Sequence, residues 1–282
     1  MVMKKTLLIV VILIAVIILI VTSVKKQTSS TTNSPIKIGA MFVLSGDAAK
    51  YGEVGRNGVN MALEKYNNSA DVVSGKKPKV EVIYEDTHGD PKTAVSVYQK
   101  FTSVDRVKAI LGPFFVVEAT AIAPLAEKDN FPVISISPIG ADQRGTSNPL
   151  AVWPDPTLES KQFAEYVYNH EGVKSVAILT TKDPWEAEVA NGFNDRFKEL
   201  GGKVTDFESV LSDRDTSLPV TRALKSNPDA IYLGTYLKFQ YFVKKIRELG
   251  YKGKLYSIEV DDYLADVTKP YSEGTVFISP AY

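Results

Sequence analysis

The chain has 282 residues, 44% hydrophobic and 23% charged, which is typical of a globular protein and excludes a disordered or fibrous one. Its 33 Lys and Arg residues balance 33 Asp and Glu residues, so no global charge excess indicates a nucleic-acid partner. Cysteine is absent, which excludes disulfides, thiolate metal sites, cysteine nucleophiles and a lipid-modified N-terminal cysteine. His88 and His170 lie far apart without a second ligand at metal-binding spacing, so we expect no metal site and no cofactor.

The first 26 residues have the pattern of a membrane-targeting segment. Two lysines on each side flank an uncharged, apolar run over residues 7–21. This run is about as long as the shortest membrane-spanning helix and longer than the usual apolar part of a cleaved signal peptide. Residues 1–26 are therefore predicted to be either an uncleaved anchor or a cleaved signal peptide, and both export the rest of the chain. Residues 27–35 are small and polar, as expected of a flexible linker.

From residue 36 onward, apolar strands alternate with amphipathic helices. The first series predicts strands over 36–43, 80–84, 109–111, 132–136 and 150–153, and helices over 53–66, 91–103 and 116–128. Asp90-Pro91 is a strong helix start, because Asp caps free amides and Pro at the first helical position loses no hydrogen bond.

A second series follows a crossing at Pro154-Asp155-Pro156. It predicts helices over 158–169, 186–200, 215–225 and 239–249, and strands over 175–179, 204–210, 230–233, 254–258 and 275–278. Such alternation is typical of parallel sheets with helices on both faces. The two series predict a two-lobed α/β protein, with an N-terminal lobe over 36–155 and a C-terminal lobe over 156–282. Open parallel sheets bind ligands where their strands end, so we expect function in the loops that follow the strands.

Short motifs occur in a fixed order over nearly all of residues 36–282. They are Ile38-Gly39, Leu44-Ser45-Gly46, Lys50-Tyr51-Gly52, EDTHGDPK over 85–92, Gly112-Pro113, Ser137-Pro138 and NPDA over 227–230. Together they resemble the periplasmic binding proteins of the leucine/isoleucine/valine type. The resemblance implies a type I Venus-flytrap protein outside the cytoplasm that delivers a small amino acid, amide or related ligand to the permease subunits of an ABC importer. The N-terminal segment would link it to the membrane.

The resemblance also implies where the ligand lies. In the N-terminal lobe it indicates Tyr51 as a cover, Phe115 and Val116 at a helix start that receives a carboxylate, and Ser137, Ile139 and Ala141 after the fourth strand. In the C-terminal lobe it indicates Trp185, Tyr236 and Glu259, and Glu259 would face an ammonium group.

Val116 and Ala141 stand where the family usually has hydroxyl residues. The aromatic and acidic half of the family site is thus present, and the hydroxyl half is not. Two alternatives follow. Backbone amides at the helix start hold the carboxylate, or the ligand lacks a carboxylate, as an amide, a polyamine or an apolar cation does. Phe114, Phe115 and Trp185 would suit a cation or an apolar group, and of the two phenylalanines we expect only one to face the cleft.

Three classes of function come into question: transport, sensing and catalysis. A transport protein is the leading hypothesis, and a membrane-tethered sensor ectodomain is the alternative that the same clamp could serve. An enzyme is not expected, because no nucleophile elbow, P-loop, metal spacing or dinucleotide-binding glycine triplet occurs.

Three other residues and the end of the chain have ordinary structural interpretations. Asp261 and Asp262 are interpreted as a helix cap, and Trp153 as packing at the crossing. Because the family continues beyond the strand predicted over 275–278, the chain is expected to lack part of each lobe.

Overall fold

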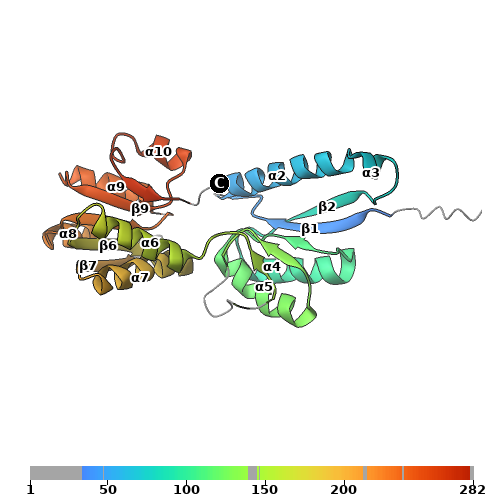
Figure 1. Cartoon of the computed structure of the whole chain (residues 1–282), viewed down its shortest axis with the longest axis horizontal. Helices are drawn as coiled ribbons and strands as arrows, with labels where there is room; N and C mark the ends of the chain where they lie inside the picture. The colour runs from blue at the N-terminus through green and yellow to red at the C-terminus, as the bar shows by residue number, and fades with distance from the viewer. Residues whose placement is uncertain are drawn as a thin grey trace, which may run out of the picture.

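The computed structural model describes residues 34–46, 48–138, 145, 147–211, 215–236 and 238–279. Within these ranges the chain forms two five-stranded sheets, one in each half of the chain, each flanked by helices (Figure 1). The predicted two-lobed α/β fold is confirmed. The predicted membrane segment lies outside the described residues. In the part of the chain that is described, no helix is long and apolar enough to cross a membrane.

The sheet of the N-terminal lobe has the order β2-β1-β3-β4-β5, and all neighbouring strands are parallel. Its strands are β1 (Ile36–Phe42), β2 (Val80–Asp86), β3 (Ile110–Leu111), β4 (Val133–Ser135) and β5 (Leu150–Ala151). Its helices are α2 (Ala49–Asn67), α3 (Ala70–Val73), α4 (Pro91–Lys100) and α5 (Val116–Asp129).

Helices cover both faces of this sheet, with α2 on one side and α4 and α5 on the other (Figure 1). Neighbouring residues of β1 point to opposite faces, as strand geometry requires. Met41 joins the buried cluster formed with α4 and α5, whereas Phe42 packs beside Gly55 of α2. Both residues are fully buried, so this strand is apolar on both sides, as the sequence predicts.

The sheet of the C-terminal lobe has the order β10-β9-β8-β6-β7 and is also parallel throughout. Its strands are β6 (Ser175–Thr181), β7 (Lys203–Val210), β8 (Ala230–Gly234), β9 (Lys254–Ile258) and β10 (Val276–Ile278). Its helices are α6 (Pro156–Asn169), α7 (Pro184–Glu199), α8 (Ser217–Lys225), α9 (Phe239–Glu248) and α10 (Asp262–Thr268).

Two buried clusters lie on opposite faces of this second sheet. On one face, Tyr232 of β8 stacks on Phe193 of α7 with ring centroids 3.9 Å apart, and α6 completes the cluster. On the other face, Leu233 joins side chains of α8, α9 and α10. The alternation of Tyr232 and Leu233 between the two clusters fixes the register of β8 within the lobe.

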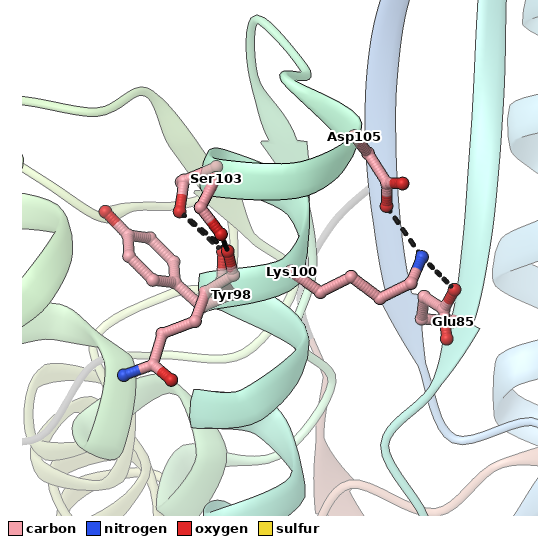
Figure 2. Close-up of polar contacts among 7 residues, drawn as sticks. Glu85, Tyr98, Lys100, Ser103 and Asp105 are labelled. Atoms are coloured by element: carbon pink, nitrogen blue, oxygen red, sulfur yellow. Dashed lines mark hydrogen bonds and ion pairs between the residues drawn. The ribbon is translucent and has the colours of Figure 1, made fainter.

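The helix predicted over 91–103 is present, but it continues as a π-helical segment, η1 (Phe101–Asp105), which ends at Arg106 in the left-handed conformation. Figure 2 shows the ammonium of Lys100 between Glu85 of β2, at 2.8 Å, and Asp105, at 2.7 Å. The pair with Glu85 joins the end of the helix to the sheet, and the pair with Asp105 spans the π-helical segment. Because Lys100 is 43% exposed, each contributes on the order of 1 kcal/mol or less.

Of two further helices, α3 has no counterpart among the predicted elements and α10 is indicated only by its cap. The four residues of α3 are too few to show a helical period. At α10, the capping interpretation is confirmed for Asp261, whose carboxylate accepts a hydrogen bond from the Leu264 amide at 2.7 Å. Asp262 is the first residue of that helix.

Gly52 allows α2 to approach β1 closely, and this contact sets the place of Tyr51. A Cβ atom on Gly52 would lie 1.9 Å from the carbonyl oxygen of Val43, whereas one on Gly58 of the same helix would meet no heavy atom within 4 Å.

We expect Gly52→Ala to lower the free energy of unfolding by about 1–3 kcal/mol through this clash. The control Gly58→Ala should raise it by about 1 kcal/mol, because alanine favours helix. Urea denaturation measures both, and equal stability of the two variants would contradict this packing.

Candidate functional site

A cavity of about 630 Å³ lies between the two lobes, lined by residues that follow the carboxyl ends of strands in both sheets. This is where open parallel sheets bind ligands. The volume is in the range of pockets that enclose a small molecule. The cavity therefore joins segments far apart in the sequence into one candidate binding site.

The wall from the N-terminal lobe is aromatic. Tyr51 stacks on Phe114 with ring centroids 5.4 Å apart, and Phe114 meets Phe115 edge to face at 5.4 Å. The prediction that only one phenylalanine faces the cleft is wrong, since both line the cavity. Tyr51 was predicted to lie in a loop. It lies instead in the first turn of α2, which begins four residues earlier than expected.

The wall from the C-terminal lobe combines aromatic and acidic side chains. Trp185 lies in the first turn of α7, whose N-terminus is capped by Asp183 with a 3.0 Å bond from the Trp185 amide. Tyr236 follows β8, and its amide donates to the carboxylate of buried Glu186 at 2.8 Å. Backbone hydrogen bonds thus hold both aromatic residues at the cavity.

Two contacts join the two lobes, and a third joins the crossing segment to the C-terminal lobe. The hydroxyl groups of Tyr51 and Tyr236 lie 2.5 Å apart, and the Tyr236 hydroxyl also donates to Asp261 at 2.5 Å. The ammonium of Lys50 lies 3.2 Å from the ring centroid of Tyr263 on α10. At the crossing, the indole nitrogen of Trp153 donates to Glu259 at 3.0 Å. These contacts bring the lobes together around the cavity.

Glu259 is the acidic group at the centre of this arrangement. Its backbone has a φ of 22°, a left-handed value unusual for a side chain of this size, and its amide donates to Ile278 of β10 at 2.9 Å. Burial, reinforced by the nearby carboxylate of Glu159 and opposed by the Trp153 hydrogen bond, raises the pKa of Glu259 to about 7. Glu159 is itself only 6% exposed, and burial raises its pKa as well.

Most of the predicted site residues meet at the cavity. They are Tyr51, Phe115, Val116, Ser137, Trp185, Tyr236 and Glu259. Ile139 and Ala141 lie outside the described residues. That any of them binds a ligand stays a prediction.

Several residues that line the cavity are not among those predicted from the sequence, and they include Trp153, Glu186, Asp261 and Asp262. Trp153 was interpreted as packing at the crossing. It lies at the crossing, but it also lines the cavity and contacts Glu259. No sequence pattern indicates Glu186. Its carboxylate accepts a hydrogen bond from the Tyr236 amide because the start of α7 lies beside the loop after β8, and no local pattern encodes a contact between segments so far apart. Among the described residues, no group of three or more His, Asp or Glu side chains is placed to hold a metal ion.

Comparison with known proteins assigns the family. Residues 35–282 match the sequence profile of the periplasmic binding proteins. The chain belongs to the periplasmic binding protein family. It is 24% identical to Leu/Ile/Val-binding protein homolog 1 of Brucella suis over 250 residues, which cover 86% of this chain and 66% of that protein. It is 25% identical to Leu/Ile/Val-binding protein BraC3 of Rhizobium johnstonii over 207 residues, which cover 72% of this chain and 55% of that protein. The chain thus spans less than two thirds of the length of these relatives.

Solved structures share the fold. A leucine-binding protein, LivK, from Thermotoga maritima matches 88% of this chain and 70% of its own with a TM-score of 0.78 and 24% identity. A solute-binding protein of an ABC transporter from Rhodopseudomonas palustris, in complex with 3,4-dihydroxy benzoic acid, matches 80% of this chain and 62% of its own with a TM-score of 0.69 and 22% identity. The resemblance to leucine/isoleucine/valine-type binding proteins is confirmed.

The raised pKa of Glu259 predicts a pH dependence of stability. An unfolded glutamate has a pKa of about 4.3, so between about pH 4.3 and 7 the folded protein binds more protons than the unfolded chain. The free energy of unfolding should therefore fall as the pH rises through this window. Glu259→Gln cannot ionise, so its free energy of unfolding should not show that part of the fall. The melting temperature of the variant minus that of the wild type should therefore increase between pH 5 and 8. A constant difference between the two proteins across this range would contradict the assignment.

The tyrosine pair predicts a shift in the separation of the lobes. Tyr51→Phe removes the hydrogen bond to Tyr236, worth about 1 kcal/mol, and should move the balance roughly fivefold toward conformations with separated lobes. Small-angle X-ray scattering should then give a larger radius of gyration than for the wild type. Tyr241→Phe is the control, because Tyr241 lies on α9 and is 52% exposed. Identical scattering from the two variants would show that the pair does not hold the lobes together.

Proposed function

We propose that this chain is the solute-binding component of an ABC importer, and that it captures a small amino-acid-like molecule between its two lobes outside the cytoplasm. The observation that carries the proposal is the cavity of about 630 Å³ with walls from both lobes. Membership of a family of binding proteins supports a role in capture rather than in catalysis.

The mechanism follows from the position of the cavity. A ligand that touches both walls binds the conformation with the lobes together more tightly than the separated one, and so shifts the population toward it. Tyr51 and Tyr236 already contact each other across the gap and need little rearrangement to enclose a ligand. In the proposed system, permease subunits would recognise the closed form. The lobes would span 36–155 and 156–282, and the segment over 1–26 would target the protein to the membrane.

A thermal-shift screen of the purified protein tests this proposal. A solute that binds only the folded state must raise the melting temperature, by linkage. We expect at least one compound among amino acids, amides, amines and short peptides to do so at micromolar to millimolar concentration. Tyr236→Ala should abolish the shift, and the exposed control Tyr241→Ala should keep it. A wild-type protein that no small solute stabilises would contradict a role in solute capture.

A further inference from the structure

The described wall of the cavity carries acidic groups and no Lys, Arg or His side chain. The acidic residues are Asp183, Glu186, Glu259, Asp261 and Asp262. Asp183 and Asp261 cap helices, and Glu186 accepts hydrogen bonds from the Tyr236 amide and the Thr181 hydroxyl. Asp262 is exposed, whereas Glu259 is partly buried and, within the described residues, its carboxylate accepts a hydrogen bond from Trp153 alone.

The side of the cavity that would hold a carboxylate lacks side-chain donors. Glu118 is fully buried, and its carboxylate accepts a hydrogen bond from the Phe115 amide at 3.0 Å. This amide at the start of α5 is therefore already bonded to a carboxylate of the protein itself. Val116 and Val117 follow without a hydroxyl group. The hydroxyl of Ser137 donates to the carbonyl of Pro138 at 2.9 Å. A ligand carboxylate on this wall would thus lie near a buried acid and meet apolar side chains.

A positive charge already lies over the ring of Tyr51, which lines the cavity, and over that of Tyr263 on α10. The ammonium of Lys50 lies 4.7 Å from the ring centroid of Tyr51 and 3.2 Å from that of Tyr263. Cations bind to aromatic faces at these distances because the ring faces carry negative potential. Inside the cavity, Tyr51 and Phe114 from the N-terminal lobe, Trp153 from the crossing and Trp185 from the C-terminal lobe present aromatic surface, and Trp153 contacts Glu259.

We propose that the ligand of this cavity is an organic cation without a carboxylate group, bound with its cationic end at Glu259 and its apolar part between the aromatic walls. The inference rests on the proposed function in solute capture and specifies the class of solute. The fold is compatible with a departure from amino acids, since the Rhodopseudomonas palustris relative is complexed with an aromatic acid that has no amino group.

Glu159 is a second buried acid, and its carboxylate acts on that of Glu259 through charge. It is 6% exposed, and its Oε2 atom has no hydrogen-bond partner among the described residues. Two buried carboxyl groups near each other resist ionisation, and a cation in the cavity relieves this repulsion. Affinity for a cation should therefore fall as the pH drops below 7, where Glu259 takes up a proton.

Isothermal titration calorimetry with two matched trios tests the inference on the wild-type protein. One trio is phenethylamine, phenylalanine and 3-phenylpropionate, and the other is 3-methylbutylamine, leucine and 4-methylpentanoate. Each trio keeps one apolar group and offers a cation, a zwitterion or an anion. We expect at least one amine to bind at pH 8 at least tenfold more tightly than its amino acid, and the anions not to bind.

Two variants locate the cation. Glu259→Gln keeps the shape of the side chain and should weaken amine binding at least tenfold, with the remaining affinity independent of pH. Asp266→Asn, at a 74% exposed acid on α10 of the same lobe, should leave binding unchanged.

The outcomes separate this inference from the proposed function. An amino acid that binds as tightly as its amine, or binding of an anion, would overturn the cationic ligand and keep solute capture. An amine that binds wild type and Glu259→Gln equally would overturn the role of Glu259. Failure of both amines to bind would also overturn the inference, and solute capture would fall only if the thermal-shift screen found no solute either.

Discussion

Every described strand runs parallel to its neighbours in both sheets, so all strands of a lobe deliver their following loops to one edge. The two sheets turn these edges toward each other, and the cavity is the space that they share. The site depends on this constraint more than on any single side chain. Tyr51 and Tyr236 are separated by 185 positions in the sequence, yet their hydroxyl groups lie 2.5 Å apart because each follows a strand that ends at the cavity.

Helix starts do much of the local positioning at this edge. Asp183, Asp261 and Glu118 each satisfy amides at the start of a helix, and the residues just inside those helices line the cavity. These three acids therefore fix the backbone at the edge of the cavity. Glu259 precedes the α10 cap, and its carboxylate accepts a hydrogen bond from the Trp153 indole instead of from a backbone amide.

The sequence predicted the alternation of strands and helices well, because each strand is a short apolar run between clear breaks. It was less successful where position depends on three-dimensional packing. Tyr51 lies on a helix rather than in a loop, because α2 begins after Ala48 without a capping side chain that the sequence could reveal. Trp153 could not be placed in the cavity from its neighbours in the chain, since its partner Glu259 is 106 positions away. The resemblance to a family supplied the candidate residues Trp185, Tyr236 and Glu259, which no periodicity could have selected.

The most direct test of solute capture between the lobes uses the protein's own tryptophans. The chain has two, Trp153 and Trp185, and both line the cavity. Their fluorescence should be recorded while the protein is titrated with any solute that raises its melting temperature. Binding in the cavity predicts a saturable change in emission whose midpoint agrees with the calorimetric dissociation constant. A stabilising solute that leaves the emission of both tryptophans unchanged at saturation would contradict the account, because it would have bound elsewhere.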